Sequence, residues 1–110
     1  MVNIKVNVLG TEYEIIKADE KSHPLFEQVN GWCDTSVKKI YIATKEREEG
    51  DKESLQEVIN KTTRHELIHA FIYESGIDVE VDWASNESLV DFLAIQIPKI
   101  VKVFEQVNAM

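Results

Sequence analysis

The hydrophobic pattern changes its period near the middle of the chain, and this change limits the folds that the sequence can adopt. From residue 2 to residue 8, apolar and polar side chains alternate, as in a half-buried strand. Gly10-Thr11 predicts a turn, and the segments 11–17 and 37–43 have the β-branched and aromatic composition of two further strands. From about Lys52 to Glu74, apolar residues recur instead at spacings of three and four, which predicts a helix.

The second half of the chain also carries the start and stop signals of helices. Gly76 is a natural stop for the first helix, and Asn86 is a suitable N-cap for a second. Pro98 then either kinks this second helix or begins a separate one. With turns at Asn30-Gly31 and at residues 34–36, the pattern predicts an α+β fold, in which a small N-terminal antiparallel sheet precedes two or three helices. At 110 residues the chain has room for one domain, residues 1–110.

Composition excludes several classes of function. The chain has 20 acidic and 12 basic residues and a net charge of −8, which argues against a nucleic-acid partner because such proteins need a basic surface to neutralise phosphates. No apolar run approaches the ~18 residues that cross a bilayer, and the alternating N-terminus is unlike a signal peptide. Cys33 is the one cysteine, so an internal disulfide is excluded. We therefore expect a cytoplasmic protein with no membrane partner.

The predicted first helix contains Arg64-His65-Glu66-Leu67-Ile68-His69. His65 and His69 are four apart and share one face of the helix, so both imidazoles can reach one metal ion. Zinc accepts neutral imidazole nitrogen and prefers four ligands. Glu66 lies about 100° around the helix from His65, where it can accept a proton from a water molecule that the zinc acidifies. The motif predicts one Zn²⁺ per chain, with Glu66 as the catalytic base.

A catalytic zinc needs a third protein ligand, and no histidine follows His69. Glu87 is the best candidate, because it lies in the first turn of an anchored helix and has a long side chain. Asp91, four residues further on the same helix face, is shorter, which suits a hydrogen bond from the outer nitrogen of His65. The alternative for this pair is a solvated first turn, in which the helix dipole favours Glu87. The competing ligands are Asp78, Glu80, Asp82, Asp91, Cys33 and, if the N-terminal half folds back, His23.

The motif His65-Glu66-x-x-His69 followed by Asn86-Glu87-x-x-x-Asp91 resembles the gluzincin arrangement of thermolysin-like zinc peptidases. The small size, and a strand hairpin from Asn30-Gly31 through Ile42 ahead of the motif helix, is similar to the minimal ImmA/IrrE-type peptidases of phages and mobile elements. The resemblance covers roughly residues 31–93 and implies a zincin-like fold. It implies zinc ligation by His65, His69 and Glu87, with Glu66 as the base and Asp91 as the partner of His65. It also implies a regulatory protein, such as a repressor, as the substrate.

The residue that stabilises the transition state is not identifiable at a place that matches this family. His23 and Tyr41 are the candidates for polarising the scissile carbonyl, and the strand near residues 38–43 is a candidate edge for an extended peptide. The favoured function is hydrolysis of a peptide bond in an intracellular protein or peptide. Two alternatives remain: a peptide deformylase-like amidase with Cys33 as third ligand, and a zinc-containing binding module that performs no catalysis.

Overall fold

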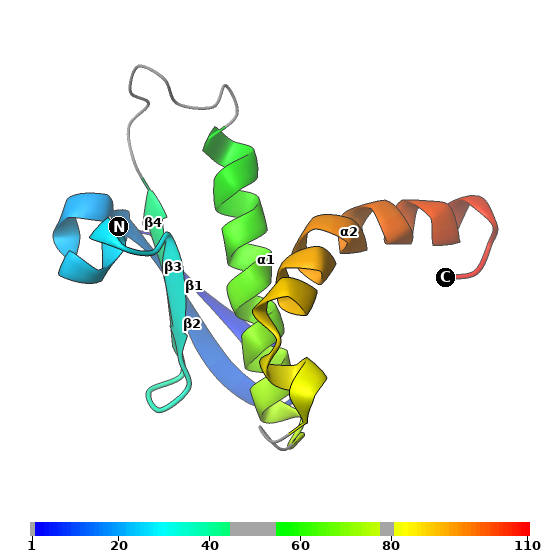
Figure 1. Ribbon diagram of the computed structural model, residues 1–110, viewed down its shortest axis with the longest axis horizontal. Helices are drawn as coiled ribbons and strands as arrows, with labels where there is room; N and C mark the ends of the chain where they lie inside the picture. Colours follow the sequence, from blue (N-terminus) through cyan, green and yellow to red (C-terminus); the bar gives the residue numbers. More distant parts are fainter. Residues whose placement is uncertain (1, 45–54, 78–80) are drawn as a thin grey trace.

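The computed structural model describes residues 2–44, 55–77 and 81–110, and it has a four-stranded sheet in the N-terminal half followed by two helices (Figure 1). The predicted α+β class and order of elements are thereby confirmed. The strands are β1 (Val2–Val8), β2 (Thr11–Asp19), β3 (Gly31–Asp34) and β4 (Lys39–Thr44). The helices are α1 (Leu55–Glu74) and α2 (Glu87–Gln106), with 3-10 turns η1 (Glu20–Ser22), η2 (Pro24–Glu27) and η3 (Asp82–Ser85).

The strand order is β1-β2-β4-β3, and one of its three pairings is parallel. β1 and β2 form an antiparallel hairpin, as do β3 and β4, whereas β2 and β4 run in the same direction. The sheet is therefore mixed, and the prediction of a wholly antiparallel sheet was wrong on this point. The reason lies in the connection through η1 and η2, which enters β3 at the end of the sheet where β2 finishes. The β3–β4 hairpin then returns beside β2, which makes β4 an interior strand and leaves β1 and β3 at the edges.

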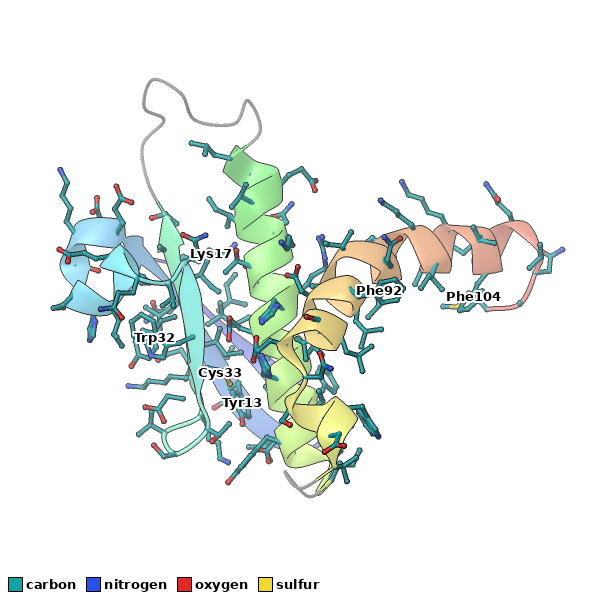
Figure 2. All side chains as sticks on the ribbon, viewed as in Figure 1. Tyr13, Lys17, Trp32, Cys33, Phe92 and Phe104 are labelled. Carbon is teal, nitrogen blue, oxygen red and sulfur yellow. The ribbon has the colours of Figure 1, made fainter. Side chains whose placement is uncertain are left out.

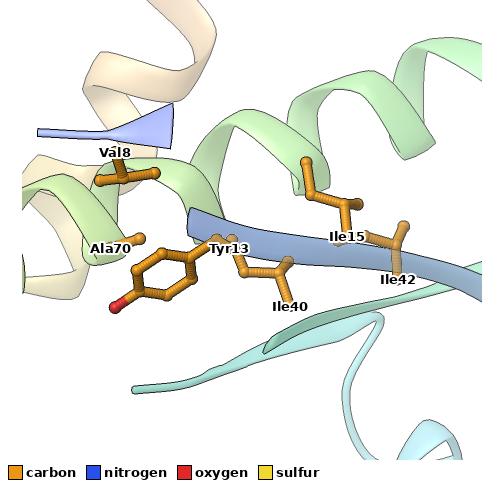
Figure 3. Packing of buried hydrophobic residues seen from close by; sticks show 6 residues of the cluster. All are labelled: Val8, Tyr13, Ile15, Ile40, Ile42 and Ala70. Carbon is orange, nitrogen blue, oxygen red and sulfur yellow. The ribbon is translucent and has the colours of Figure 1, made fainter. Parts of the chain in front are cut away.

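Alternation along the strands divides the apolar residues between the two faces of the sheet. One face packs against α1, and its buried cluster comprises Val8, Tyr13, Ile15, Ile40, Ile42 and Ala70 (Figure 3). The other face carries Ile16, Ala18, Trp32, Tyr41 and Ala43, with Phe26 of η2 packed over them. Trp32 and Cys33 consequently lie on opposite sides of β3, with Cys33 toward α1 (Figure 2). This division determines which side chains can reach a site on α1.

The ends of the helices follow the sequence signals. α1 ends at Glu74, and Gly76 takes the left-handed conformation at φ +78°, as a helix stop requires. Asn86 caps α2, its Oδ1 accepting a hydrogen bond from the Leu89 backbone N–H at 2.9 Å. Pro98 lies inside one continuous α2, which bends along its length (Figure 1).

The predicted start of α1 at Lys52 and the predicted loop over residues 46–53 lie outside the described residues. Within the described ranges, no helix is both long and apolar enough to span a membrane.

The far end of α1 is tied to the sheet by Glu74. Its carboxylate accepts hydrogen bonds from Thr11 Oγ1 at 2.9 Å and from the Tyr13 hydroxyl at 2.8 Å, and it pairs with Lys38 Nζ at 3.0 Å. These contacts join the helix to the β1–β2 hairpin and to the β3–β4 turn. They fix α1 over the sheet, and with it the direction in which the motif residues point.

Gly31 is the first residue of β3, although Asn30-Gly31 was predicted to form a turn. The hairpin turn lies at residues 35–38, where Lys38 has a φ of 58°. Gly31 is needed for close packing, because a Cβ at this position would meet the Tyr41 carbonyl oxygen at 2.8 Å and Thr62 Cγ2 of α1 at 3.0 Å. The glycine therefore lets β3 approach α1 closely, beside the motif helix.

Replacing Gly31 is expected to force these neighbours apart. Gly31→Ala should lower the free energy of unfolding by ~1–3 kcal/mol, the usual cost of overpacking. Lys5→Ala, on an exposed position of β1, is the control and should change it by less than ~0.5 kcal/mol. Urea unfolding of the two variants measures the difference, and equal midpoints would contradict the close approach.

Candidate metal centre

Helices α1 and α2 bring three potential metal ligands together. His65 and His69 lie on successive turns of α1, and Glu87 is the first residue of α2. His65 Nε2 lies 2.9 Å from Glu87 Oε2, His69 Nε2 lies 2.9 Å from Glu87 Oε1, and the two Nε2 atoms are 3.2 Å apart. The structure thus places all three residues predicted to bind zinc in one cluster, within 4.8 Å of one another.

The donor set and its spacing fit a zinc ion. Two imidazole nitrogens and a carboxylate oxygen are the ligands of many catalytic zinc sites, in which the ion lies about 2.0–2.1 Å from each ligand atom. In a tetrahedral site these distances separate neighbouring ligand atoms by roughly 3.3 Å. The observed separations of 2.9–3.2 Å are close to this value. Only a small outward movement of the three side chains would admit the ion.

Asp91 lies one helical turn after Glu87 and faces the outer nitrogen of His65. Its Oδ1 is 3.4 Å from His65 Nδ1 and 3.2 Å from Lys61 Nζ. A proton on Nδ1 that is donated to Asp91 leaves Nε2 free as an electron-pair donor, which is the tautomer that metal ligation requires. Lys61 holds the same carboxylate oxygen from the turn of α1 before His65. Asp91 is therefore placed to orient His65, in the position that the sequence predicted for it.

Among the residues that the structure describes, Glu66 is the one charged residue that is buried, with 9% of its surface exposed. Burial raises the pKa of its carboxyl, and the nearby Glu87 carboxylate acts in the same direction, while His65 and His69 oppose the shift. Glu66 lines the same hollow as His69 and Glu87. A carboxylate whose basicity is increased by burial, beside a cluster of metal ligands, can accept a proton from a water molecule there.

Two hollows flank the metal cluster, and Glu66 and Glu87 line both of them. The larger, about 400 Å³, is lined by Cys33 of β3, by Thr35 of the β3–β4 turn and by residues of α1 and η3. The second, about 320 Å³, is lined by residues 29–31 and by the α1 turn that carries Lys61 and Thr62. The two hollows, together called the cleft below, contact β3 at Cys33 and at Gly31, respectively.

The sequence did not reveal the walls of the larger hollow. They include Ile72, Tyr73, Ile77, Ala84 and Ser85. Ile72 and Tyr73 follow His69 by three and four residues, so helical periodicity could have placed them on its face. Ile77, Ala84 and Ser85 come from the segment after α1 and from η3, where no periodic signal exists.

His23 and Tyr41, the predicted candidates for stabilising the transition state, lie away from the cluster. The His23 ring is 4.9 Å from that of Trp32, and Trp32 stacks on Tyr41 at 4.6 Å. This aromatic group covers the sheet face opposite α1. Tyr41 faces there because its neighbours Ile40 and Ile42 both point to α1. The structure therefore does not bring either residue to the metal cluster.

Cys33 and Asp82, two of the competing third ligands, do not belong to the ligand cluster. Cys33 lines the cleft but is not part of the cluster, and burial together with the charge of Glu66 raises the pKa of its thiol to about 12, which disfavours the thiolate that binds metal. Asp82 lies in η3 and is exposed, whereas a loop was predicted there. Asp78 and Glu80 lie outside the described residues. Comparison of the chain with protein-family models, curated proteins and solved structures gives no match.

Proposed function

We propose that this chain is a zinc-dependent peptidase that hydrolyses a peptide bond in a protein or peptide substrate. The observation that carries the proposal is the convergence of His65, His69 and Glu87, at 2.9–3.2 Å, beside the buried carboxyl of Glu66. A purely structural zinc site fills all four positions with protein ligands. Here the three ligands border the cleft, His69 and Glu87 at its larger hollow and His65 at the other, which supports a site that accepts a fourth ligand from solvent or substrate.

Zinc bound by these three residues would supply a Lewis acid that polarises a carbonyl and lowers the pKa of water. Glu66 accepts the proton of the attacking water and later donates it to the leaving amine, so that the amine departs uncharged. Asp91, whose Oδ1 lies 3.4 Å from His65 Nδ1, is placed to accept a hydrogen bond from that nitrogen and so to keep the ring in the orientation that ligation needs. Lys61 holds the Asp91 carboxylate in place.

The cleft supports a peptide as the substrate class. β3 is an edge strand that pairs with β4 on one side only, and the two hollows contact it. An extended peptide can add to the free edge as a further strand, which brings its carbonyl groups past the metal cluster. The strand to which a peptide could add is thus β3, rather than the segment 38–43 that we predicted. Apolar walls at Ile72, Ile77 and Ala84 suit an apolar side chain of the peptide.

The resemblance to ImmA/IrrE-type peptidases supports an intracellular regulatory protein of a phage or mobile element as the natural substrate. The deformylase-like alternative loses support, because Cys33 does not belong to the ligand cluster. The non-catalytic binding module differs from the peptidase in needing no base at Glu66.

Metal analysis tests the zinc site directly. We expect about one zinc per chain after reconstitution near neutral pH, and we expect His69→Ala to abolish it because two ligands hold the ion far less tightly than three. His23→Ala is the matched control, since that ring lies on the opposite face of the sheet and should leave the zinc content unchanged. A wild-type protein that takes up no zinc would overturn the proposal. Cleavage of an unfolded protein substrate, lost with a chelator and restored by zinc, tests the activity.

A further inference from the structure

Arg64 precedes the first motif histidine, and its side chain contacts α2. Arg64 Nε donates a hydrogen bond of 2.6 Å to the backbone carbonyl oxygen of Ala94, a residue with no exposed surface. In an α-helix this carbonyl would accept from the N–H four residues later. That residue is Pro98, which has no N–H, and its ring crowds the same carbonyl. The oxygen that Arg64 takes is therefore the one whose helical partner Pro98 removes.

This contact lies close to the elements that hold Glu87. α2 packs against α1, and the buried residues of α2 are Val90 and Ala94, whereas the side chain of Glu87 is 69% exposed. The packing of its own side chain therefore does little to fix Glu87, whose position depends on how α2 sits against α1. A buried carbonyl without a donor is unfavourable, and α2 could relieve it by moving toward solvent. Such a movement would carry Glu87 away from His65 and His69.

We propose that Arg64 is a positioning residue of the metal centre, which occupies the carbonyl freed by Pro98 and so holds Glu87 opposite the two histidines. The inference rests on the proposed zinc site. Pro98 comes after all three ligands in the sequence. Through the hydrogen bond from Arg64 to the Ala94 carbonyl, it is linked to the geometry of the cluster. Pro98 lies within α2, whose later part, including Phe104, runs away from the sheet (Figure 2).

The direction in which zinc affinity changes when Arg64 is replaced distinguishes a positioning role from a purely electrostatic one. A cation next to a ligand histidine repels a divalent metal ion, so removing the charge of Arg64 would tighten zinc binding if charge alone mattered. Loss of the hydrogen bond to Ala94 instead predicts weaker binding. Arg64→Met removes both the charge and the donor while keeping a long side chain.

The experiment compares the wild type, Arg64→Met, Pro98→Ala and the double variant. Zinc affinity is measured by competition with a chromogenic chelator, and the visible spectrum of the Co²⁺-substituted protein reports the ligand geometry. We expect Arg64→Met to weaken zinc binding about 10-fold or more, in the range found when a residue that orients a ligand is lost, and to alter the Co²⁺ spectrum. Pro98→Ala should bind zinc like the wild type. The double variant should recover most of the affinity, because alanine brings to position 98 the N–H that the Ala94 carbonyl needs.

Urea unfolding of the metal-free proteins gives a second, independent measurement. The urea midpoint should fall with Arg64→Met in the Pro98 background and fall less in the Pro98→Ala background. Arg64→Lys, which keeps the charge but lacks the guanidinium Nε, should lose affinity as well and serves if Arg64→Met does not fold. Wild-type or tighter zinc binding by Arg64→Met, or an equal loss in both backgrounds, would overturn the inference. A wild type that binds no zinc would contradict the proposed function instead, and the metal-free midpoints would still decide whether Arg64 and Pro98 are coupled.

Discussion

Glu66→Gln is expected to retain zinc and the native fold while losing peptide cleavage. Glutamine has nearly the same shape as glutamate, so it fits the buried position, but its amide cannot accept a proton from water. A positioned general base contributes about 10²–10⁴-fold to a rate, and a decrease in kcat of that size is expected. Because Glu66 is 9% exposed and is not one of the clustered ligands, the substitution should leave zinc affinity nearly unchanged.

The measurement is kcat on one unfolded protein substrate, with zinc content and thermal unfolding recorded for the same preparations. Glu105→Gln is the matched control, since Glu105 is exposed on α2 well beyond Pro98 and should retain full activity. A Glu66→Gln variant as active as the wild type would refute the assigned base. If the wild type binds zinc and cleaves no protein substrate, the binding module becomes the better explanation.

The elements of the fold were predictable because their signals are local. Alternation over residues 2–8 and spacings of three and four in α1 each follow from the geometry of one element. The parallel pairing of β2 with β4 has no such signal, because a period of two shows which side chains share a face and says nothing about the neighbouring strand. Gly31 was misread for a related reason, since the need for a small residue arises from Thr62 on another element.

The same distinction applies to the site. His65 and His69 are one turn apart on one helix, so their spacing alone places them together. The position of Tyr41 could have been inferred from alternation with Ile40 and Ile42, had the face toward α1 been identified first. The bond from Arg64 to the Ala94 carbonyl joins a side chain to a backbone atom 30 residues away. The acceptor is a backbone atom, so the identity of the residue at position 94 gives no sign of this contact. Only the packed structure reveals it.

Replacing Glu87, the proposed third ligand, is expected to cause a large loss of zinc affinity. Glu87→Ala removes one of three ligands and should weaken zinc binding by more than the roughly 10–100-fold typical of residues that only orient a ligand. Its carboxylate reaches both histidines, with one oxygen 2.9 Å from each Nε2. The exposure of Glu87 does not argue against ligation, since the open side of the cluster is where a substrate must enter.

Asp91→Ala and Asp82→Ala calibrate this loss. Asp91 meets His65 through Nδ1, the nitrogen that does not face the cluster, so its removal should cost about 10–100-fold in affinity or activity. Asp82 is exposed in η3 and lies outside the ligand cluster, so its removal should change the affinity little. Zinc titrations of the three variants give the order directly. A larger loss at Asp82 than at Glu87 would move the third ligand from α2 to η3, and the docking of α2 would then no longer control the metal centre.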